Sequence, residues 1–264
     1  MTVASGRRRV GLIGHGAVGS VIAEGLERGV EQLSLAGVYA HSTVPDRYRI
    51  ESFDELVERS DLVVEAASQE AVRAHGPTAV AAAKDLLIVS VGALADPSLL
   101  TTLRAGMGRL LVTNGAIGGI DQLRAASLLS ELDRVSLTTR KAPHALVRPW
   151  MSPDLLDRMD NGDEPTVVFD GPARDAVERF PASINVAATL ALSTIGFDRV
   201  RVRLIADPSA TSVEHVIEAT GPAGTYQFRF SNAASRTNPR TSAITPYAVL
   251  RGLSDLDAHT VIGF

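Results

Sequence analysis

The chain of 264 residues contains no cysteine. This absence excludes disulfide bridges, a thiolate nucleophile and every metal site that depends on a cysteine ligand, and no metal is expected. It also fits a reducing compartment, so the cytoplasm is the expected location.

A long apolar run and a surplus of positive charge are missing as well. No stretch approaches the roughly 18 to 20 apolar residues of a membrane span. The apolar run that follows Arg7, Arg8 and Arg9 covers only residues 10–13, which is too short for the core of a signal peptide. The formal net charge of −4 gives no electrostatic reason for a polyanionic partner. The sequence therefore predicts a protein without membrane or nucleic-acid partners.

A glycine-rich loop near the N-terminus is the most informative motif present. Residues 10–13 have an apolar strand pattern and lead into Gly14-His15-Gly16-Ala17-Val18-Gly19, which opens directly into a helical pattern. In a G-x-G-x-x-G loop the first glycine permits the tight turn, the second lets a pyrophosphate approach the backbone, and the third lets helix and strand pack closely. The first N–H groups of the helix then face the phosphates. We therefore expect Gly14, Gly16, Ala17, Val18 and Gly19 to bind a dinucleotide.

Strand and helix patterns alternate through the first part of the chain. Two helix starts carry capping signals, a capping box from Ser52 to Glu55 and an N-cap at Asp96 before Pro97. This alternation predicts an α/β fold with an N-terminal Rossmann-type, doubly wound parallel sheet. After the strand at 10–13, the expected strands are 35–39, 61–66, 86–91 and 110–113.

The pattern becomes richer in strands after about residue 120. A helix is expected at 184–192, and a last helical pattern begins near Thr245. We predict a dinucleotide-binding domain at 1–120, completed by the C-terminal segment 245–264, and a second α+β domain at 121–244 with a mostly antiparallel sheet. The expected strands of this second domain are 135–139, 166–169, 200–206, 213–219 and 226–231.

The residues after the second predicted strand bear on the choice of cofactor. NAD-binding proteins usually place a carboxylate about twenty residues beyond the glycines, where it holds the ribose hydroxyls. Here Ala40-His41-Ser42-Thr43 follows the strand, and Ser42, Thr43 and Arg47 are able to accept the 2′-phosphate of NADP. The expected cofactor is NAD or NADP, and this loop favours use of both or a preference for NADP; the alternative is that the loop is only a solvated polar turn.

A dehydrogenase needs a proton donor or acceptor beside the carbon that exchanges hydride. The chain has six histidines. His15, His41, His75 and His259 lie in the phosphate loop, at the adenosine end, in a polar helix and in the tail, which are poor positions for this role. His144 and His215 remain, and residue chemistry alone leaves both open.

Several segments of the chain together resemble the L-aspartate dehydrogenase family, from the glycine loop nearly to the C-terminus. The segments that carry the resemblance beyond the glycine loop are Asn114-Gly115-Ala116-Ile117-Gly118-Gly119, Thr138-Thr139-Arg140-Lys141-Ala142-Pro143, Phe180-Pro181-Ala182-Ser183-Ile184-Asn185-Val186-Ala187, Gly196-Phe197-Asp198, Arg203-Leu204-Ile205-Ala206-Asp207-Pro208 and Asn238-Pro239-Arg240-Thr241-Ser242.

The resemblance implies a second domain like that of dihydrodipicolinate reductase, used for substrate, catalysis and dimerisation, and a homodimer. It implies that Ala116 and Asn185 contact the nicotinamide end of the cofactor and that His215 is the catalytic residue. The chain departs from the family at Ala142, at Ser183 and at Val216, where the family more often has Pro, Asn and Glu. The missing carboxylate beside His215 bears on the pKa of that histidine and on substrate preference.

The implied reaction is reversible oxidation of L-aspartate through iminosuccinate to oxaloacetate and ammonia, and iminosuccinate is able to feed NAD synthesis. The two substrate carboxylates need cationic or N–H partners. Lys141 is the expected cation, with Asn114 and Ser242 as hydrogen-bonding partners. Two alternatives stay open: a related reductase of another small acid, such as a dihydrodipicolinate reductase, and a non-catalytic NAD(P)-binding sensor.

Overall fold

The chain divides into two units in the computed structural model, which describes residues 7–30, 32–162, 164–181, 184–238 and 241–262. The first unit runs to Gly115 and takes in the described residues from Thr245 on, and the second runs from Ala116 to Ile244. The change in sequence pattern predicts a boundary after residue 120 instead. Residues 116–119 join the second unit because Asn232 Nδ2 donates to the Ala116 carbonyl at 2.8 Å and Gly119 (φ +72°) packs against the ring of Phe228.

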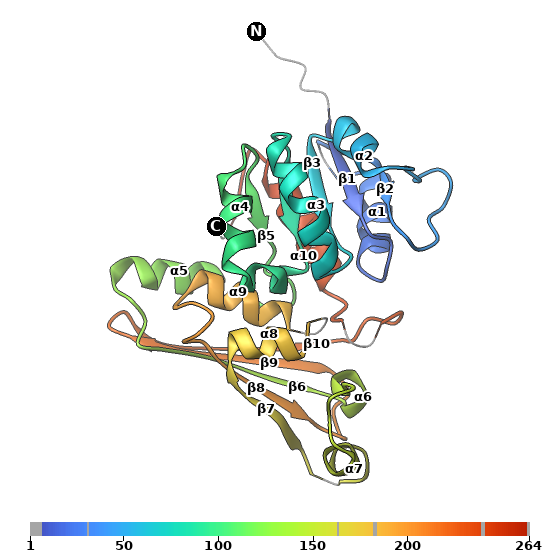
Figure 1. Ribbon diagram of the computed structural model, residues 1–264. Helices are drawn as coiled ribbons and strands as arrows, with labels where there is room; N and C mark the ends of the chain where they lie inside the picture. Colours follow the sequence, from blue (N-terminus) through green and yellow to red (C-terminus); the bar gives the residue numbers. More distant parts are fainter. Residues whose placement is uncertain (1–6, 31, 163, 182–183, 239–240, 263–264) are drawn as a thin grey trace. The chain divides into compact units, whose positions relative to one another are not determined.

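The first unit is built on a five-stranded parallel sheet with strand order β2-β1-β3-β4-β5 (Figure 1). This sheet confirms the predicted Rossmann-type fold. Its strands are β1 (Arg8–Ile13), β2 (Leu33–Tyr39), β3 (Leu62–Glu65), β4 (Asp85–Ile88) and β5 (Leu110–Val112).

The helices of the first unit begin at the predicted caps. Ser52 Oγ accepts from Glu55 N at 3.2 Å, and Asp96 Oδ1 accepts from Ser98 N at 2.9 Å, so both N-caps satisfy helix N–H groups that otherwise lack partners. None of the described helices in either unit is long and apolar enough to cross a membrane. The helices are α1 (Gly19–Arg28), α2 (Phe53–Arg59), α3 (Gln69–Ala81), the 3-10 helix η1 (Val91–Ala95), α4 (Pro97–Ala105) and α10 (Thr245–Asp255).

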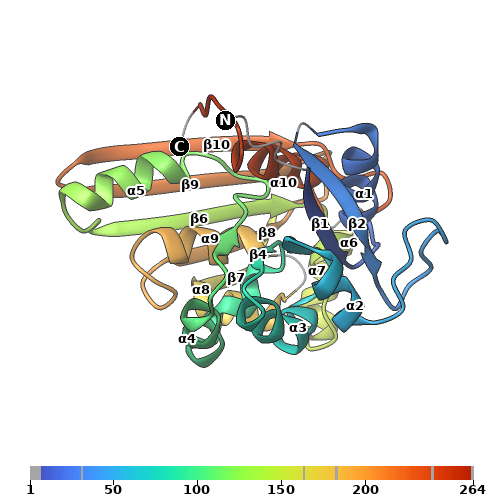
Figure 2. The ribbon, with the colours of Figure 1, turned by 90° about the horizontal axis from the view of Figure 1, so that it is seen from above.

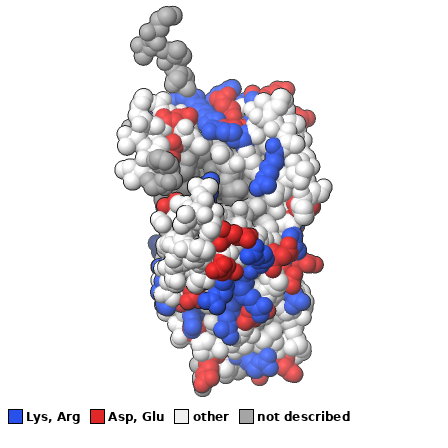
Figure 3. All heavy atoms as spheres, turned by 90° about the vertical axis from the view of Figure 1, so that its left-hand side faces the viewer, with Lys and Arg blue, Asp and Glu red and all other residues white. Residues whose placement is uncertain are grey.

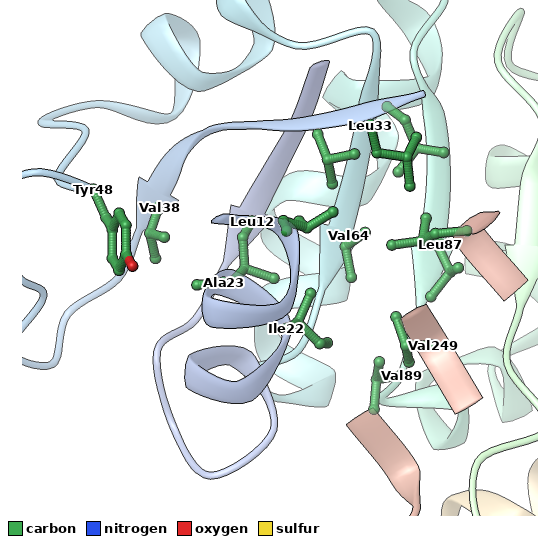
Figure 4. Packing of buried hydrophobic residues seen from close by; sticks show 14 of the residues in the cluster. Leu12, Ile22, Ala23, Leu33, Val38, Tyr48, Val64, Leu87, Val89 and Val249 are labelled. Atoms are coloured by element: carbon green, nitrogen blue, oxygen red, sulfur yellow. The ribbon is translucent and has the colours of Figure 1, made fainter. Parts of the chain in front are cut away.

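One core of the first unit joins both ends of the chain. Ile22 from α1 and Leu87 from β4 pack in the same cluster as Val249 and Leu253 from α10, and Figure 4 shows Val249 near Leu87. Burying an aliphatic side chain of this size contributes about 1.5–3 kcal/mol. The C-terminal helix is therefore part of the hydrophobic core of the first unit.

The predicted strand at 86–91 ends earlier than expected, at Ile88. Val89 N still donates to the Glu65 carbonyl, but Ser90 N donates to the Glu65 side chain at 2.9 Å. Because the backbone of Ser90 is taken by a carboxylate, the chain leaves the sheet and turns into η1.

The second unit has a five-stranded mixed sheet with order β10-β9-β6-β8-β7. Only β6 and β8 pair in parallel among these strands, so the expectation of a mostly antiparallel sheet is confirmed. The strands are β6 (Arg134–Lys141), β7 (Thr166–Pro172), β8 (Arg201–Ala206), β9 (Val213–Gly221) and β10 (Gly224–Asn232).

Three helices cover one face of this sheet, as Figures 1 and 2 show. Side chains on that face are buried at every second residue of β6, while the residues between them are more exposed, and one of these, Arg140, pairs with Asp207 at 2.8 Å. Figure 3 shows acidic and basic groups side by side on one surface of the molecule. The covering helices are α5 (Ile120–Leu129), α8 (Ala173–Arg179) and α9 (Asn185–Ser193), while α6 (Pro143–Leu146) and α7 (Pro153–Asn161) follow β6 along the chain.

Candidate active site

The glycine loop is tight on its inner side and open on its outer side. A Cβ atom on Gly14, which has φ +97°, would lie 2.7 Å from Ala67 Cβ, and one on Gly19 would lie 2.2 Å from the Gly14 carbonyl oxygen. A Cβ atom on Gly16 would meet nothing within 4 Å. The backbone is thus packed against the protein at two glycines and freely approachable at the third, which is the arrangement that a pyrophosphate requires.

The position of this loop in the sheet supports the same use. The loop follows β1, which lies between β2 and β3, and connections leave to opposite sides of the sheet there. Open α/β sheets bind ligands outside the carboxyl ends of their strands at this switch point.

A cavity of about 400 Å³ adjoins the loop. It is lined by the glycine loop, by residues 39–42 after β2, by residues 66–68 after β3 and by one side of α3. Its size and its lining by small side chains suit the adenosine half of a dinucleotide.

Arg47 does not line this cavity. Its guanidinium donates to Glu27 at 3.1 Å and lies 4.5 Å from the ring centre of Tyr48. Thr43 offers its carbonyl to His15 Nδ1 at 3.3 Å, which ties the loop after β2 to the glycine loop. Of the three residues expected to accept a 2′-phosphate, the cavity lining includes Ser42.

Glu65, at the end of β3, holds two loops at the carboxyl edge of the first sheet. Its side chain is fully buried and accepts from Ala67 N at 2.8 Å, Ser90 N at 2.9 Å and Ser90 Oγ at 2.8 Å. Burial raises the pKa of this carboxyl group, and the surrounding donors oppose that shift. Glu65 thereby fixes the loop after β3, which lines the cavity, to the end of β4.

The second unit contains a buried polar cluster of Thr139, Lys141 and His215. Register places Thr139 of β6 directly opposite His215 of β9, and Thr139 Oγ1 lies 2.9 Å from His215 Nδ1. Lys141 follows two residues after Thr139 and so shares its face of the strand. Their exposed fractions are 0% for Thr139, 3% for Lys141 and 2% for His215.

Burial lowers the pKa of both basic side chains in this cluster. It lowers the pKa of Lys141 to about 8, with a further contribution from the charge of Arg148. It lowers the pKa of His215 to about 3, and the nearby charge of Lys141 adds to this effect. At neutral pH the cluster therefore pairs a neutral imidazole with a lysine ammonium group.

The other predicted acid–base and substrate-binding residues differ from this cluster in burial or in the unit to which they belong. His144 is exposed on the short helix α6, whereas His215 is buried. Asn114 is exposed and belongs to the first unit, so the two units hold different members of the predicted substrate set. Ser242 is buried beside Ala234, with which it forms an isolated bridge.

The residues expected at the nicotinamide end both belong to the second unit. Ala116 is buried with its carbonyl bound by Asn232, and Asn185 is the first residue of α9. The positions 182–183 and 239–240 within the resembling segments, including the Ser183 departure, lie outside the described residues. Among the described residues, no group of three or more His, Cys, Asp or Glu side chains is arranged to hold a metal ion.

Sequence reasoning assigned no role to Thr139, Glu65 or Arg148. Thr139 has a usable signal, because it precedes Lys141 by two residues in a strand and so shares its face. Glu65 also has one, since it is an acidic residue at the end of an otherwise apolar strand. We find no sequence signal for Arg148, which acts on Lys141 from the segment after α6.

Two family models match separate parts of the chain. A family model described as the NAD-binding domain of homoserine dehydrogenase matches residues 14–108, which confirms the dinucleotide-binding assignment. A second model, described as the C-terminal part of aspartate dehydrogenase, matches residues 121–256.

Individual relatives match over nearly the whole chain. An L-aspartate dehydrogenase of Methanocella arvoryzae is 38% identical over 92% of this chain and 96% of its own length, and one of Pseudomonas aeruginosa is 37% identical over 95% and 97%. The crystal structure of aspartate dehydrogenase from Thermotoga maritima superposes with a TM-score of 0.72 at 27% identity, covering 97% of this chain and 99% of that one. The chain belongs to the L-aspartate dehydrogenase family.

Proposed function

We propose that this protein is an NAD(P)-dependent L-aspartate dehydrogenase that oxidises L-aspartate through iminosuccinate to oxaloacetate and ammonia, reversibly. The observation that carries the proposal is the buried Thr139–Lys141–His215 cluster, in a chain whose other unit has an open glycine loop and a cavity suited to a dinucleotide. Family membership supports the same substrate.

The residues that hold the cofactor are proposed from two regions. Gly14, Gly16, Ala17, Val18 and Gly19 bind the pyrophosphate, and the packing around Gly14 and Gly19 fits this group because it leaves Gly16 open. Ala116 and Asn185 contact the nicotinamide end, as the family resemblance implies. When bound, the nicotinamide accepts a hydride from C2 of the substrate.

His215 acts as the base in the oxidative direction. If Nδ1–H donates to Thr139 Oγ1, Nε2 carries the lone pair and accepts a proton from the substrate ammonium group. The neutral amine then supplies the electron pair that forms C=N as hydride leaves C2. Because water afterwards replaces the imine nitrogen, the same histidine returns its proton to the departing ammonia.

Lys141 binds a substrate carboxylate as a point charge. Its ammonium is buried, and an ammonium without water around it gains more from a carboxylate than an exposed one does. A bound carboxylate also offsets the lysine charge that lowers the pKa of His215, so substrate binding makes His215 a stronger base. Asn114 and Ser242 complete the proposed set of substrate-binding residues.

The oligomeric state and the location are part of the same proposal. We infer a homodimer from the family resemblance and a cytoplasmic location from the absence of cysteine. Light scattering of the purified chain at micromolar concentration tests the first, and a mass of one chain would contradict it. Fractionation of cells tests the second.

The reaction is tested by following reduction of NAD⁺ and NADP⁺ with L-aspartate, D-aspartate and L-glutamate. We expect turnover with L-aspartate alone, and a loss on the order of 100-fold in His215→Ala. Full activity is expected in the matched control His144→Ala, because His144 is exposed.

Three results would contradict parts of this proposal. Turnover that survives His215→Ala but is lost in His144→Ala would move the acid–base role to His144. Reduction of a different small acid instead of oxidation of L-aspartate would favour the related reductase. Binding of NAD⁺ without turnover of any substrate would favour a sensor.

A further inference from the structure

The cavity of the first unit has imidazole groups at the end where β2 finishes. His41, in the loop directly after β2, lines the cavity with an exposed side chain. His75, on α3, lines it from the neighbouring wall. The first residue beyond β2 is Ala40, so the position at which NAD-binding proteins usually carry a ribose-binding carboxylate is apolar here.

The wall behind His41 is aromatic and well packed. His75 lies between Phe53, with ring centres 4.4 Å apart, and Tyr39, which meets it edge-on at 5.4 Å. The ring of His41 meets Tyr39 at 6.0 Å in a second edge contact. Tyr39 thus touches both imidazoles and keeps them at the same end of the cavity.

The nearby cations of the loop after β2 are bound elsewhere. Arg47 is held by Glu27, and Arg49 donates to the Val44 carbonyl at 3.1 Å and lies 3.7 Å from Asp46. None of the residues lining the described cavity is a lysine or an arginine. A 2′-phosphate bound at this end would therefore have an imidazole as its positively charged partner.

We propose that His41 is the residue that recognises the 2′-phosphate of NADP, so that the preference for NADP over NAD is greater when its imidazole carries a proton. This inference rests on the proposed dinucleotide site and adds a specificity-determining residue to it. The imidazolium form donates a charge-assisted hydrogen bond to the phosphate, whereas the neutral form offers only a weak one.

Other titratable groups lie near this end of the cavity. Glu70 lines the cavity, and hydrogen bonds from its own backbone and from Ser68 lower the pKa of its carboxyl group, so it stays ionised from pH 6 to 8. Burial and the neighbouring His41 lower the pKa of His75, so His75 gains charge only at lower pH. His15 also lines the cavity, with Nδ1 3.3 Å from the Thr43 carbonyl oxygen, so a His15→Gln variant is needed to separate its effect from that of His41. Asp54 on α2 is exposed beside Phe53.

The test compares two half-cofactors that differ only in the 2′-phosphate. Dissociation constants of 5′-AMP and 2′,5′-ADP are measured by calorimetry at pH 8 and pH 6.5, above the second phosphate pKa of about 6. The ratio of the two constants cancels effects on the shared 5′-phosphate. We expect this ratio to favour 2′,5′-ADP about tenfold more at the lower pH.

Three variants make the test specific. His41→Gln should remove the pH dependence of this ratio, and His41→Arg should favour 2′,5′-ADP at both pH values. His144→Gln, an exposed histidine in the other unit, should behave as the unaltered chain. The same pattern is expected for NAD⁺ and NADP⁺.

Two outcomes would overturn the role of His41 but not the dinucleotide site. One is a ratio of the 5′-AMP and 2′,5′-ADP dissociation constants that does not change with pH, and the other is a pH dependence that survives His41→Gln. Loss of the dependence in His15→Gln instead would assign the phosphate to the glycine loop. Failure of both 5′-AMP and NAD⁺ to bind would overturn the dinucleotide site itself, which separates this result from the others.

Discussion

The two units of this protein build their sites from different materials. In the first unit the glycine loop offers backbone groups, and its geometry depends on the lack of a side chain at Gly14, Gly16 and Gly19. In the second unit Thr139, Lys141 and His215 offer side chains, which are buried on neighbouring strands. A site made of backbone is sensitive to added atoms, whereas a site made of buried polar groups is sensitive to charge and to lost hydrogen bonds. The following predictions separate these two kinds of sensitivity.

The largest effect is expected from one added methyl group in the first unit. Gly19→Ala places a Cβ 2.2 Å from the Gly14 carbonyl oxygen, and because both atoms belong to the backbone neither moves easily. We expect a loss of about 3 kcal/mol in the free energy of unfolding, measured by urea denaturation.

Gly16→Ala is the matched control, since its Cβ meets nothing within 4 Å. Its midpoint of unfolding should stay unchanged, while NAD⁺ affinity falls at least about tenfold because the methyl group stands where the pyrophosphate approaches. Equal stability losses in the two variants would contradict this account of the loop.

The second unit should respond to acid through His215. Its pKa is about 3 in the folded chain, and an unfolded histidine has a pKa near 6.5. Between these values the unfolded chain binds a proton that the folded chain does not, so the contribution of neutral His215 is complete above pH 6.5 and is lost as the pH falls toward 3. The loss amounts to about 1.4 kcal/mol for each pH unit, or about 2 kcal/mol from pH 6.5 to 5.

Urea denaturation of His215→Gln across this pH range checks the prediction, because glutamine has no charge to gain. Between pH 6.5 and pH 5, the free energy of unfolding should fall less in His215→Gln than in the unaltered chain. In His144→Gln it should fall as much as in the unaltered chain. Parallel pH profiles for the unaltered chain and His215→Gln would show that this histidine is not held neutral by folding.

A smaller effect is expected from Thr139→Val, which removes the partner of His215 Nδ1 and keeps the shape of the side chain. We expect kcat to fall about tenfold with KM for L-aspartate nearly unchanged, because the base loses its orientation while Lys141 remains. Thr139→Ser should restore most of kcat. Thr138→Val, one residue earlier on the opposite face of β6, should leave both constants unchanged, and an equal loss there would indicate a general effect on the strand.

The difference between the units also explains which features are predictable from the sequence. The glycine loop is contiguous, so its use is visible in six residues, and the caps at Ser52 and Asp96 are equally local. The choice between His144 and His215 is not local. It depends on the register of β6 against β9, which brings Thr139 to His215 across 76 residues, and no local pattern specifies that pairing.

The end of a strand is also hard to predict when a contact distant in the sequence decides it. The sequence predicts an apolar strand through Val91, but the chain leaves the sheet after Ile88 because a carboxylate 25 residues earlier binds Ser90. The boundary between the units moves for a similar reason, since Gly119 packs on Phe228 of a distant strand.

The packing of α10 has a consequence for how the protein is made. Val249 and Leu253 are fully buried in the core of the first unit, and Leu250 lies against Gly25 of α1. On a ribosome these residues emerge only after the whole second unit has been synthesised. The first unit is therefore able to complete its core only after the second unit has been made, and until then part of its apolar surface stays uncovered.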